Sequence, residues 1–237
     1  MRIRLYDVTR ITRTGLVPHS AIDAEDGAIT AVYDTLPAEE PGVRSVDAKG
    51  AYAAPGFIDI HLHGGGGVEF MDATPELPGA MALGEALRAR GVVASIAHSD
   101  ADYETCRRAL ACGFTDITHI YSGCSMVHRK NGYRFGGVVE AGLLEDAFTV
   151  QVIADGKHLP PELLRLIVKC KGADRISLIT DALFAAGSDL PDGSVLRQAN
   201  GMETVLEDGV MKLPDRQAFA GSVATMDRLV RLSLIHI

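Results

Sequence analysis

Two histidines, His61 and His63, end an apolar segment and lie two residues apart. Successive side chains of a β-strand alternate between its two faces, so an H-x-H pair at a strand end directs both imidazoles to one side. Histidine is the commonest metal ligand, and such a pair supplies half of a metal site. Four glycines at positions 64–67 follow at once and allow backbone and ligand to approach closely. The pair predicts the entry strand of a metal-dependent hydrolase.

Two further histidines, His98 and His119, each follow a short apolar run. Taken singly, either could be a hydrogen-bonded structural residue. Four histidines at strand ends predict imidazoles that converge on one or two divalent ions, with zinc the best match and iron, manganese or cobalt as alternatives. Asp181 follows the last apolar run, where a carboxylate can take a proton from a metal-bound water and return it to a leaving group. The alternative for Asp181 is a helix N-cap.

Two loops carry groups that could bind an anion. Asp155 and His158 flank a lysine after the run at 150–154, which suits an anionic or sugar-like substrate, although a solvated loop has the same composition. The sequence His-Arg-Lys at 128–130 lies in a Gly-rich loop and suits a phosphate, or is a common surface composition.

Apolar runs alternate with helical patterns from Pro55 onward, which indicates a parallel sheet covered by helices. The ionisable residues described above follow the runs, as on the active-site face of a β/α barrel. A doubly wound sheet is the alternative, but the Gly-rich phosphate loop typical of that fold is absent. The expected strands are 57–61, 92–97, 117–121, 150–154 and 176–180, and the expected helices are 79–90, 103–112, 161–171 and 223–232.

Residues 1–54 differ, because short β-branched runs alternate there with turn residues such as Asp26-Gly27. We interpret them as a small antiparallel β-unit that forms part of a β-sandwich. The predicted fold is therefore α/β, with this β-unit followed by a TIM-like (β/α) barrel domain over residues 55–231.

Composition narrows the possible partners. The 237 residues are 47% hydrophobic and 23% charged, as in soluble globular proteins. A formal net charge of −8 without a Lys/Arg-rich run argues against nucleic acid. No signal peptide and no membrane-length apolar stretch is present, and the four cysteines form no C-x-x-C pair. We expect a cytoplasmic protein that acts on a small molecule.

Five segments stand in a fixed order along the chain, and together they resemble the amidohydrolase superfamily, specifically the N-acetylglucosamine-6-phosphate deacetylase family. The resemblance covers nearly the whole chain, and the order of five motifs is more specific than any one of them. The segments are 54–64, 96–101, 118–121, 153–158 and 178–182.

The resemblance implies roles for particular residues. His98 and His119 match metal-binding histidines, and His61 and His63 match an H-x-H pair that some members use for a second ion. Asp181 matches the catalytic aspartate. The implied reaction is hydrolysis of the acetamide of N-acetylglucosamine 6-phosphate, in a protein that is a homodimer when intact.

The resemblance also implies substrate contacts. His158 matches a histidine that contacts the sugar phosphate, and Asp155 belongs to the same motif. Arg129 is the best equivalent of a phosphate-binding arginine, although its loop at 124–135 departs from the family's pattern. Ser122 and Gly123 replace the usual Asn-Ala. The stretch expected to line the substrate is Phe219, Ala220 and Gly221.

One part of the family's pattern is missing. Its His-Leu-Glu-Gly-Pro motif, whose glutamate is a principal metal ligand, has no counterpart among the 34 residues between His63 and His98. Five strands cannot close an eight-stranded barrel, so we expect an internally gapped, incomplete barrel with the junction near residues 72–76. We expect such a chain to bind metal weakly and to lack useful activity.

The end of the chain carries a further expectation. Residues 232–237 resemble the translation of a sequencing-library adapter, and we interpret them as a non-native tail on a C-terminally truncated chain. Two alternatives to the deacetylase stay open: another amidohydrolase of the dihydroorotase or deaminase type, and a non-catalytic fragment.

Overall fold

A computed structural model describes residues 1–61, 73–198 and 201–236 of the chain. Contacts within the chain divide it into two compact units, Met1–Phe57 and Ile58–Ile237. His63, one half of the H-x-H pair, lies outside the described residues. In the described part of the chain, no helix is long and apolar enough to cross a membrane.

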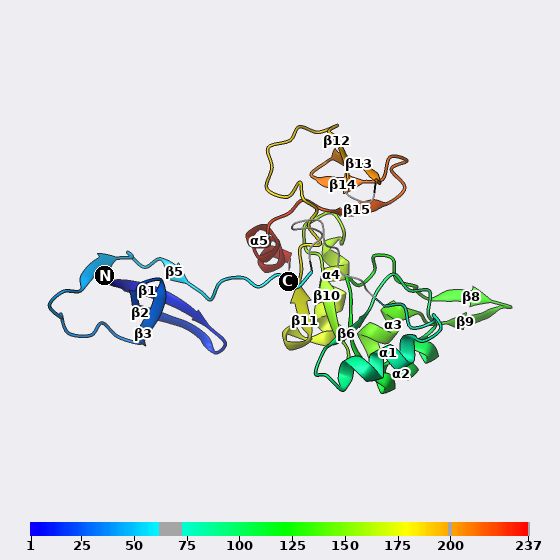
Figure 1. Cartoon of the computed structure of the whole chain (residues 1–237), viewed down its shortest axis with the longest axis horizontal. Helices are drawn as coiled ribbons and strands as arrows, with labels where there is room; N and C mark the ends of the chain where they lie inside the picture. The colour runs from blue at the N-terminus through cyan, green and yellow to red at the C-terminus, as the bar shows by residue number, and fades with distance from the viewer. Residues whose placement is uncertain (62–72, 199–200, 237) are drawn as a thin grey trace. The chain divides into compact units, whose positions relative to one another are not determined.

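The first unit is a five-stranded sheet around a long central strand (Figure 1). Two antiparallel hairpins give the order β3-β2-β1, and the short strands β4 and β5 run parallel to β1. The turn Asp26-Gly27 has φ of +50° and +85°, as a type I′ hairpin turn requires. The strands are β1 (Arg2–Thr12), β2 (Gly15–Glu25), β3 (Ala28–Tyr33), β4 (Arg44–Asp47) and β5 (Tyr52–Ala53).

A buried ion pair joins β1 to β2. Arg4 and Asp23 are both almost fully buried, and the guanidinium contacts both carboxylate oxygens, at 2.7 Å from Nε and 2.9 Å from Nη2. The hydrogen bonds from Arg4 outweigh the opposing effect of burial and lower the pKa of Asp23 to about 2. The pair therefore holds a charge that few alternative registers of these strands could satisfy.

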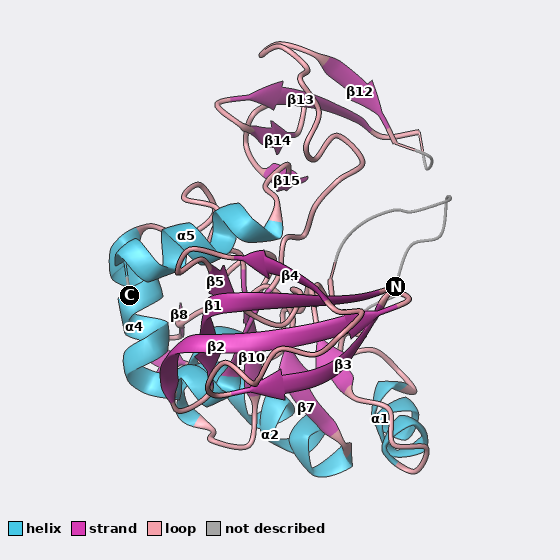
Figure 2. Cartoon of the chain, turned by 90° about the vertical axis from the view of Figure 1, so that its left-hand side faces the viewer, coloured by secondary structure: helices cyan, strands magenta, loops and turns pink. Residues whose placement is uncertain are grey.

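The second unit is built on a four-stranded parallel sheet with the order β11-β10-β7-β6. Between these strands the chain forms helices, and consecutive helices contact each other in sequence order from α1 to α5. Figures 1 and 2 show these helices and the sheet. The strands are β6 (Ala94–Ile96), β7 (Phe114–Ile117), β10 (Thr149–Val152) and β11 (Ile176–Leu178).

The helices begin and end at residues with clear local causes. Asp102 caps the second helix by accepting from the backbone N–H of Thr105 at 2.8 Å, and Gly113 ends that helix with φ of +110°. Pro161 is the first residue of the fourth helix, where its missing N–H costs nothing. The helices are α1 (Ala80–Arg88), α2 (Tyr103–Cys112), α3 (Val138–Leu144), α4 (Pro161–Lys171) and α5 (Met226–His236).

The two faces of the parallel sheet differ in chemistry. Val150 and Val152 of β10 are buried in the apolar core together with residues of the helices. Gln151 lies between them and therefore points to the opposite face. Asp116 of β7 and Ser95 of β6 hydrogen-bond on that same face. The strands are thus not the continuously apolar runs that we expected, because one face carries a buried polar network.

Further strands extend from this core. A short hairpin, β8 (His128–Lys130) with β9 (Tyr133–Phe135), projects from the loop after β7 (Figure 1). After β11 the chain forms an antiparallel sheet in the order β12-β13-β14-β15. Its strands are β12 (Val195–Arg197), β13 (Glu203–Glu207), β14 (Val210–Lys212) and β15 (Phe219–Ser222), and a short 3-10 helix, η1 (Ala173–Arg175), precedes β11.

Several sequence predictions need correction. Residues 57–61 form no strand: Phe57, Ile58 and Ile60 are exposed, because no neighbouring strand pairs with this segment in the described chain. The expected strand at 117–121 ends at Ile117, so His119 lies in a turn. The helix α3, the hairpin β8–β9 and the β12–β15 sheet were not expected, because each is short or irregular in its apolar pattern.

Two further observations bear on the ends of the predicted domain. The described strands form separate sheets and no closed barrel. The helix α5 continues to His236 and so includes most of the segment that we interpreted as a non-native tail.

Candidate active site

A cavity of about 340 Å³ lies where the loops after the parallel strands meet the β15 segment. Most of the residues singled out from the sequence line it, although they come from five separate stretches of the chain. The lining residues are His98, His119, Ser122, Gly123, His158, Asp181, Ala218, Phe219, Ala220 and Gly221. The carboxyl ends of neighbouring parallel strands thus deliver the polar groups to one place, as strand topology requires.

His98 and His119 face each other across this cavity. Their Nε2 atoms are 3.1 Å apart, and their ring centroids are 4.6 Å apart in an edge-to-face arrangement. One of the two nitrogens can donate to the other when both rings are neutral. Burial, the largest influence on His119, lowers its pKa to about 4, so this ring is neutral near pH 7.

The backbone at the chemistry-bearing residues is strained. His98, His119 and Asp181 have φ of +45°, +27° and +49°, in a region that residues other than glycine seldom adopt. Such strain persists only where the surrounding structure imposes it, and it concentrates at functional sites. Each of these residues leaves its strand by a sharp turn, which brings its side chain over the strand ends.

His61 approaches Asp181 from the neighbouring segment. Its Nε2 is 3.5 Å from Asp181 Oδ1, and its ring centroid is 5.3 Å from that of His119. The backbone fixes this contact, because the N–H of Asp181 donates to the carbonyl of His61 at 3.0 Å. Asp181 is only 7% exposed and lines the cavity.

Gly123 sets the position of the His98 ring. It has φ of +59°, and a Cβ at this position would lie 2.6 Å from His98 Nδ1. Any side chain would therefore push the imidazole out of place. On the other side of His98, the Glu76 carboxylate accepts from the Ser99 hydroxyl at 2.7 Å and from the Asp100 backbone N–H at 2.8 Å. His98 is thus flanked by a steric contact and by an anchored loop.

Asp155 holds His158 at the far end of the cavity. One carboxylate oxygen accepts from the backbone N–H groups of Lys157 and His158, both at 2.9 Å, and the other is 2.8 Å from His158 Nδ1. Burial alone would raise the pKa of Asp155, but these hydrogen bonds outweigh it and the net pKa is lowered. His158 Nε2 is left as the nitrogen available to a ligand, and Phe219 packs edge-on against the ring at 5.0 Å.

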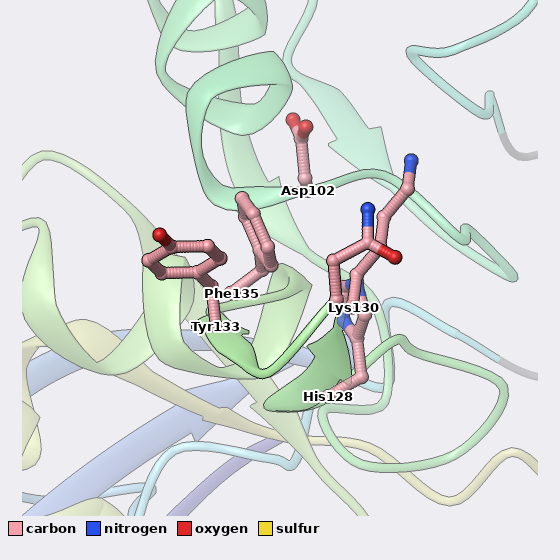
Figure 3. A pocket seen from close by; sticks show the side chains of 6 residues that line it. Asp102, His128, Lys130, Tyr133 and Phe135 are labelled. Carbon is pink, nitrogen blue, oxygen red and sulfur yellow. The ribbon is translucent and has the colours of Figure 1, made fainter.

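Arg129 is not among the residues that line the cavity. It belongs to the exposed hairpin β8–β9. A second cavity of about 270 Å³ lies at the hairpin, and Figure 3 shows the side chains that line it. Asp102 and the hairpin residues His128, Lys130, Asn131, Tyr133 and Phe135 form that lining.

The donor chemistry of the first cavity fits a divalent ion in part. In a tetrahedral zinc site, two nitrogen ligands about 2.1 Å from the metal lie roughly 3.4 Å apart. The 3.1 Å between His98 and His119 is close to that separation, and a neutral imidazole is the ligating form. Among the described residues, however, no group of three His, Cys, Asp or Glu side chains is arranged to hold a metal. The pair fits two ligand positions of an ion.

Sequence reasoning missed two buried residues beside the site, Asp116 and Gln151. The amide of Gln151 bridges Asp116 and His61, with Nε2 donating to Asp116 at 2.6 Å and Oε1 3.0 Å from His61 Nδ1. The signal that could have found them is the polar residue in the middle of each apolar strand, at 116 and at 151.

No family model matches the chain. Curated proteins are similar to it in sequence. The N-acetylglucosamine-6-phosphate deacetylase of Vibrio furnissii is 38% identical over 157 residues, which are 66% of this chain and 37% of that protein. The N-acetylgalactosamine-6-phosphate deacetylase of Escherichia coli O157:H7 is 34% identical over 157 residues, 66% of this chain and 39% of that protein. The chain thus spans less than two fifths of the length of these relatives.

Solved structures extend the likeness to the fold. An N-acetyl-D-glucosamine-6-phosphate deacetylase mutant from Mycobacterium smegmatis, in complex with N-acetyl-D-glucosamine-6-phosphate, aligns with a TM-score of 0.81 at 23% identity, covering 100% of this chain and 84% of that one. The enzyme from Pasteurella multocida gives 0.84 at 18% identity, covering 99% and 84%. The chain shares the α/β amidohydrolase fold of these structures.

Proposed function

The chain is a homologue of the N-acetylglucosamine-6-phosphate deacetylases, and we propose that its site belongs to an enzyme that hydrolyses the acetamide of N-acetylglucosamine 6-phosphate. The products are glucosamine 6-phosphate and acetate. The observation that carries the proposal is the single cavity in which His98, His119, Asp181 and His158 meet. Two converging imidazoles, a buried carboxylate and an anchored histidine are among the groups that this reaction uses.

Asp181 is the proton carrier of the reaction. It takes a proton as water adds to the acetamide carbonyl, and it returns that proton to the nitrogen as the carbon–nitrogen bond breaks. Its backbone is held on both sides, because its N–H donates to His61 and its carbonyl accepts from the Ser222 N–H at 2.9 Å. A carboxylate fixed in this way keeps its orientation through both transfers.

His98 and His119 are the residues that would hold a divalent ion, with His61 beside them. A bound ion such as zinc supplies a more acidic water and polarises the carbonyl. The resemblance implies the glutamate of a His-Leu-Glu-Gly-Pro motif as a further ligand, and this chain has no such motif between His63 and His98. We therefore expect weak metal binding and slow turnover.

His158 binds the 6-phosphate end of the sugar in this proposal. Nδ1 donates to Asp155, and in the protonated ring Nε2 carries a hydrogen as well, so this is the form that donates to a phosphate oxygen. Phe219 packs against the ring and limits its rotation. His158 and Asp181 line the same cavity of about 340 Å³, so one sugar phosphate could contact both.

A second candidate is the C4 epimer of this substrate. The relative from Escherichia coli O157:H7 is named for N-acetylgalactosamine 6-phosphate and is nearly as similar as the one from Vibrio furnissii. The two sugars share the acetamide and the phosphate, so the same four residues would serve both.

The whole protein carries further proposals. The parallel sheet and its helices would be part of a (β/α) barrel domain covering residues 55–231, with residues 1–54 as part of a β-sandwich. We also propose a homodimer for the intact protein.

The test measures binding and chemistry in the same preparation. The purified chain is titrated with each sugar 6-phosphate by calorimetry in the presence of Zn²⁺, and acetate release is followed for the chain and for Asp181→Asn. We expect binding of N-acetylglucosamine 6-phosphate, weakened about tenfold in His158→Ala, because a charge-assisted hydrogen bond contributes roughly 1.5–3 kcal/mol. We expect slow acetate release that Asp181→Asn abolishes.

Other outcomes separate the alternatives. Tighter binding and faster release with the galactosamine epimer would assign the site to the second candidate. A zinc-loaded, folded chain that binds neither sugar phosphate would reject the deacetylase assignment and leave the non-catalytic fragment.

A further inference from the structure

The polar network on the face of the parallel sheet opposite the helices leads directly to the active site. Its central member is Asp116, which is only 5% exposed. The Asp116 carboxylate accepts from the Thr149 hydroxyl at 2.6 Å on one oxygen, and from the Ser95 hydroxyl at 2.8 Å and Gln151 Nε2 at 2.6 Å on the other. The Ser95 and Thr149 hydroxyls each donate to one of its two oxygens, so both oxygens act as acceptors.

This arrangement fixes the orientation of the Gln151 amide. If the amide were turned over, its oxygen would lie 2.6 Å from a carboxylate oxygen with no proton between them. Two acceptors at that distance repel each other, and Gln151 is 94% buried, so no solvent relieves the repulsion. Nε2 therefore faces Asp116, and Oε1 must face the other way.

The oriented amide in turn fixes the tautomer of His61. Gln151 Oε1 lies 3.0 Å from His61 Nδ1, and an amide oxygen can only accept. Nδ1 must therefore carry the hydrogen. In the neutral ring, Nε2 then carries the lone pair, and this is the nitrogen 3.5 Å from Asp181 Oδ1. The lone pair of His61 Nε2 and the carboxylate oxygen of Asp181 lie side by side, and a cation between them would stabilise both.

We propose that Asp116 and Gln151 are positioning residues that hold His61 in its Nδ1–H tautomer and so present Nε2 as a ligand beside Asp181. Neither residue touches the cavity, and both act through His61. The chain of acceptor, amide and imidazole is longer by one residue than the usual carboxylate–histidine pair behind a metal. The tautomer follows from the hydrogen bonds alone, whereas its use in deacetylation rests on the proposed function.

The test reads the ring nitrogens of His61 directly. The ¹⁵N-labelled chain, free of metal and sugar, is observed by long-range ¹H–¹⁵N NMR at about pH 8, above the ordinary histidine pKa of about 6.5. His61→Gln identifies the signals. We expect Nδ1 to be the protonated nitrogen in the unmodified chain.

Gln151→Met is the decisive variant because it removes the acceptor at His61 Nδ1 at similar volume. Without that acceptor, the network no longer favours a hydrogen on Nδ1, and Asp181 Oδ1, 3.5 Å from Nε2, favours a hydrogen there instead. We expect His61 to move toward its Nε2–H tautomer. Ser95→Ala is the matched control, because it removes a hydrogen bond to Asp116 but leaves the Asp116–Gln151 contact, and it should leave the His61 signals unchanged. If Gln151→Met fails to fold, Asp116→Leu takes its place, since it removes the carboxylate that orients the Gln151 amide.

Zinc affinity supplies the second readout. By calorimetry with Zn²⁺ alone, we expect Gln151→Met and Asp116→Leu to weaken binding roughly 10- to 100-fold, the usual effect of losing the partner behind a metal-binding histidine, with Ser95→Ala within about twofold of the unmodified chain. A His61 ring protonated at Nε2 in the unmodified chain, or one unchanged in Gln151→Met, overturns the proposal. Because the NMR readout needs no sugar, the positioning role can fail while deacetylation holds, and the reverse.

Discussion

The histidines of the cavity are held in two different ways. His61 and His158 each have one ring nitrogen against a buried acceptor, Gln151 Oε1 in one case and the Asp155 carboxylate in the other. His98 and His119 contact each other through their Nε2 atoms, and His119 Nδ1 is buried without a hydrogen-bond partner in the described structure. Hydrogen bonds to other residues brace the first pair, whereas among the described residues the rings of the second pair hydrogen-bond only to each other.

This difference matters for metal binding. A histidine that binds a metal through one nitrogen usually donates the hydrogen on the other to a carboxylate or carbonyl. For His119 to present Nε2 to an ion, its hydrogen must sit on Nδ1, where no described acceptor receives it. We therefore expect the ion to depend most on His98 and His119 together, the unbraced pair. Of the braced histidines, His61 and His158, we expect His61 to add a further ligand and His158 to contact the sugar phosphate.

The largest expected effect comes from breaking the unbraced pair. His98→Ala and His119→Ala should each reduce Zn²⁺ affinity by more than the roughly 10- to 100-fold typical of changes behind the ligands. The double variant should be little worse than either single one, because one nitrogen alone cannot hold the ion. His61→Ala should cost less. Calorimetric titration with Zn²⁺ measures all four, and fully additive losses would show that the two histidines act independently.

The next effect tests the steric contact that positions His98. Gly123→Ala should weaken Zn²⁺ binding about tenfold or more, because its Cβ would lie 2.6 Å from His98 Nδ1. Gly187→Ala is the matched control: Gly187 also has positive φ, +71°, but a Cβ there meets only a methyl group at 3.9 Å. Both variants carry the same left-handed penalty of about 1 kcal/mol. Equal zinc affinities in the two would refute a role for Gly123 in placing the ring.

Asp155→Asn tests the hydrogen bond that braces His158. The new amide can still accept from the backbone N–H groups, but its nitrogen conflicts with a donor at His158 Nδ1. We expect N-acetylglucosamine 6-phosphate to bind about tenfold more weakly while Zn²⁺ affinity stays within about twofold, since the loss of one charge-assisted hydrogen bond is worth roughly 1.5–3 kcal/mol. Asp174→Asn, at an exposed aspartate, controls for the change in net charge. A parallel loss of zinc affinity would show that the two sides are coupled.

The contrast between the braced and the unbraced histidines could be predicted only in part from the sequence. The strand-end rule located His98, His119 and Asp181, because parallel strands deliver their following residues to one edge. The helices at 103–112 and 161–171 agreed with their apolar spacing, an N-cap and a first-turn proline. The family resemblance added His158 and the Phe219 segment.

The rest depends on contacts between distant segments. Gln151 and Asp116 are 35 residues apart, and no local pattern says that an amide in β10 will meet a carboxylate in β7. The positive φ of His98 and His119 is likewise imposed by tertiary packing, against the intrinsic preference of histidine. Arg129 lies on an exposed hairpin and does not line the cavity with His158 in the described chain, so its assignment to a phosphate stays a prediction.

A smaller effect concerns the pH dependence of the braced side. The pKa of Asp155 is lowered in the folded chain, so the carboxylate stabilises the fold fully above its ordinary pKa of 3.8 and loses this contribution as pH falls through the lowered value. The difference in unfolding free energy between the unmodified chain and Asp155→Asn should therefore shrink as the pH falls from about 5 to about 2. Urea unfolding followed by circular dichroism measures it, and a difference that grows over that range would contradict the assignment.

The smallest expected effect is that of Glu76→Gln, beside the unbraced pair. One glutamate oxygen accepts from the Asp100 N–H and the other from the Ser99 hydroxyl. A glutamine keeps the first bond, and the Ser99 hydroxyl can rotate to accept from the new amide, since a hydroxyl both donates and accepts. We therefore expect a loss of no more than about 1 kcal/mol in unfolding free energy and Zn²⁺ affinity within about twofold. Glu76→Ala removes both acceptors and should cost more in both measurements. If Glu76→Gln alone abolished zinc binding, the charge of Glu76 would be what holds the segment after His98 in place. His98 would then depend on a buried acceptor, as His61 and His158 do.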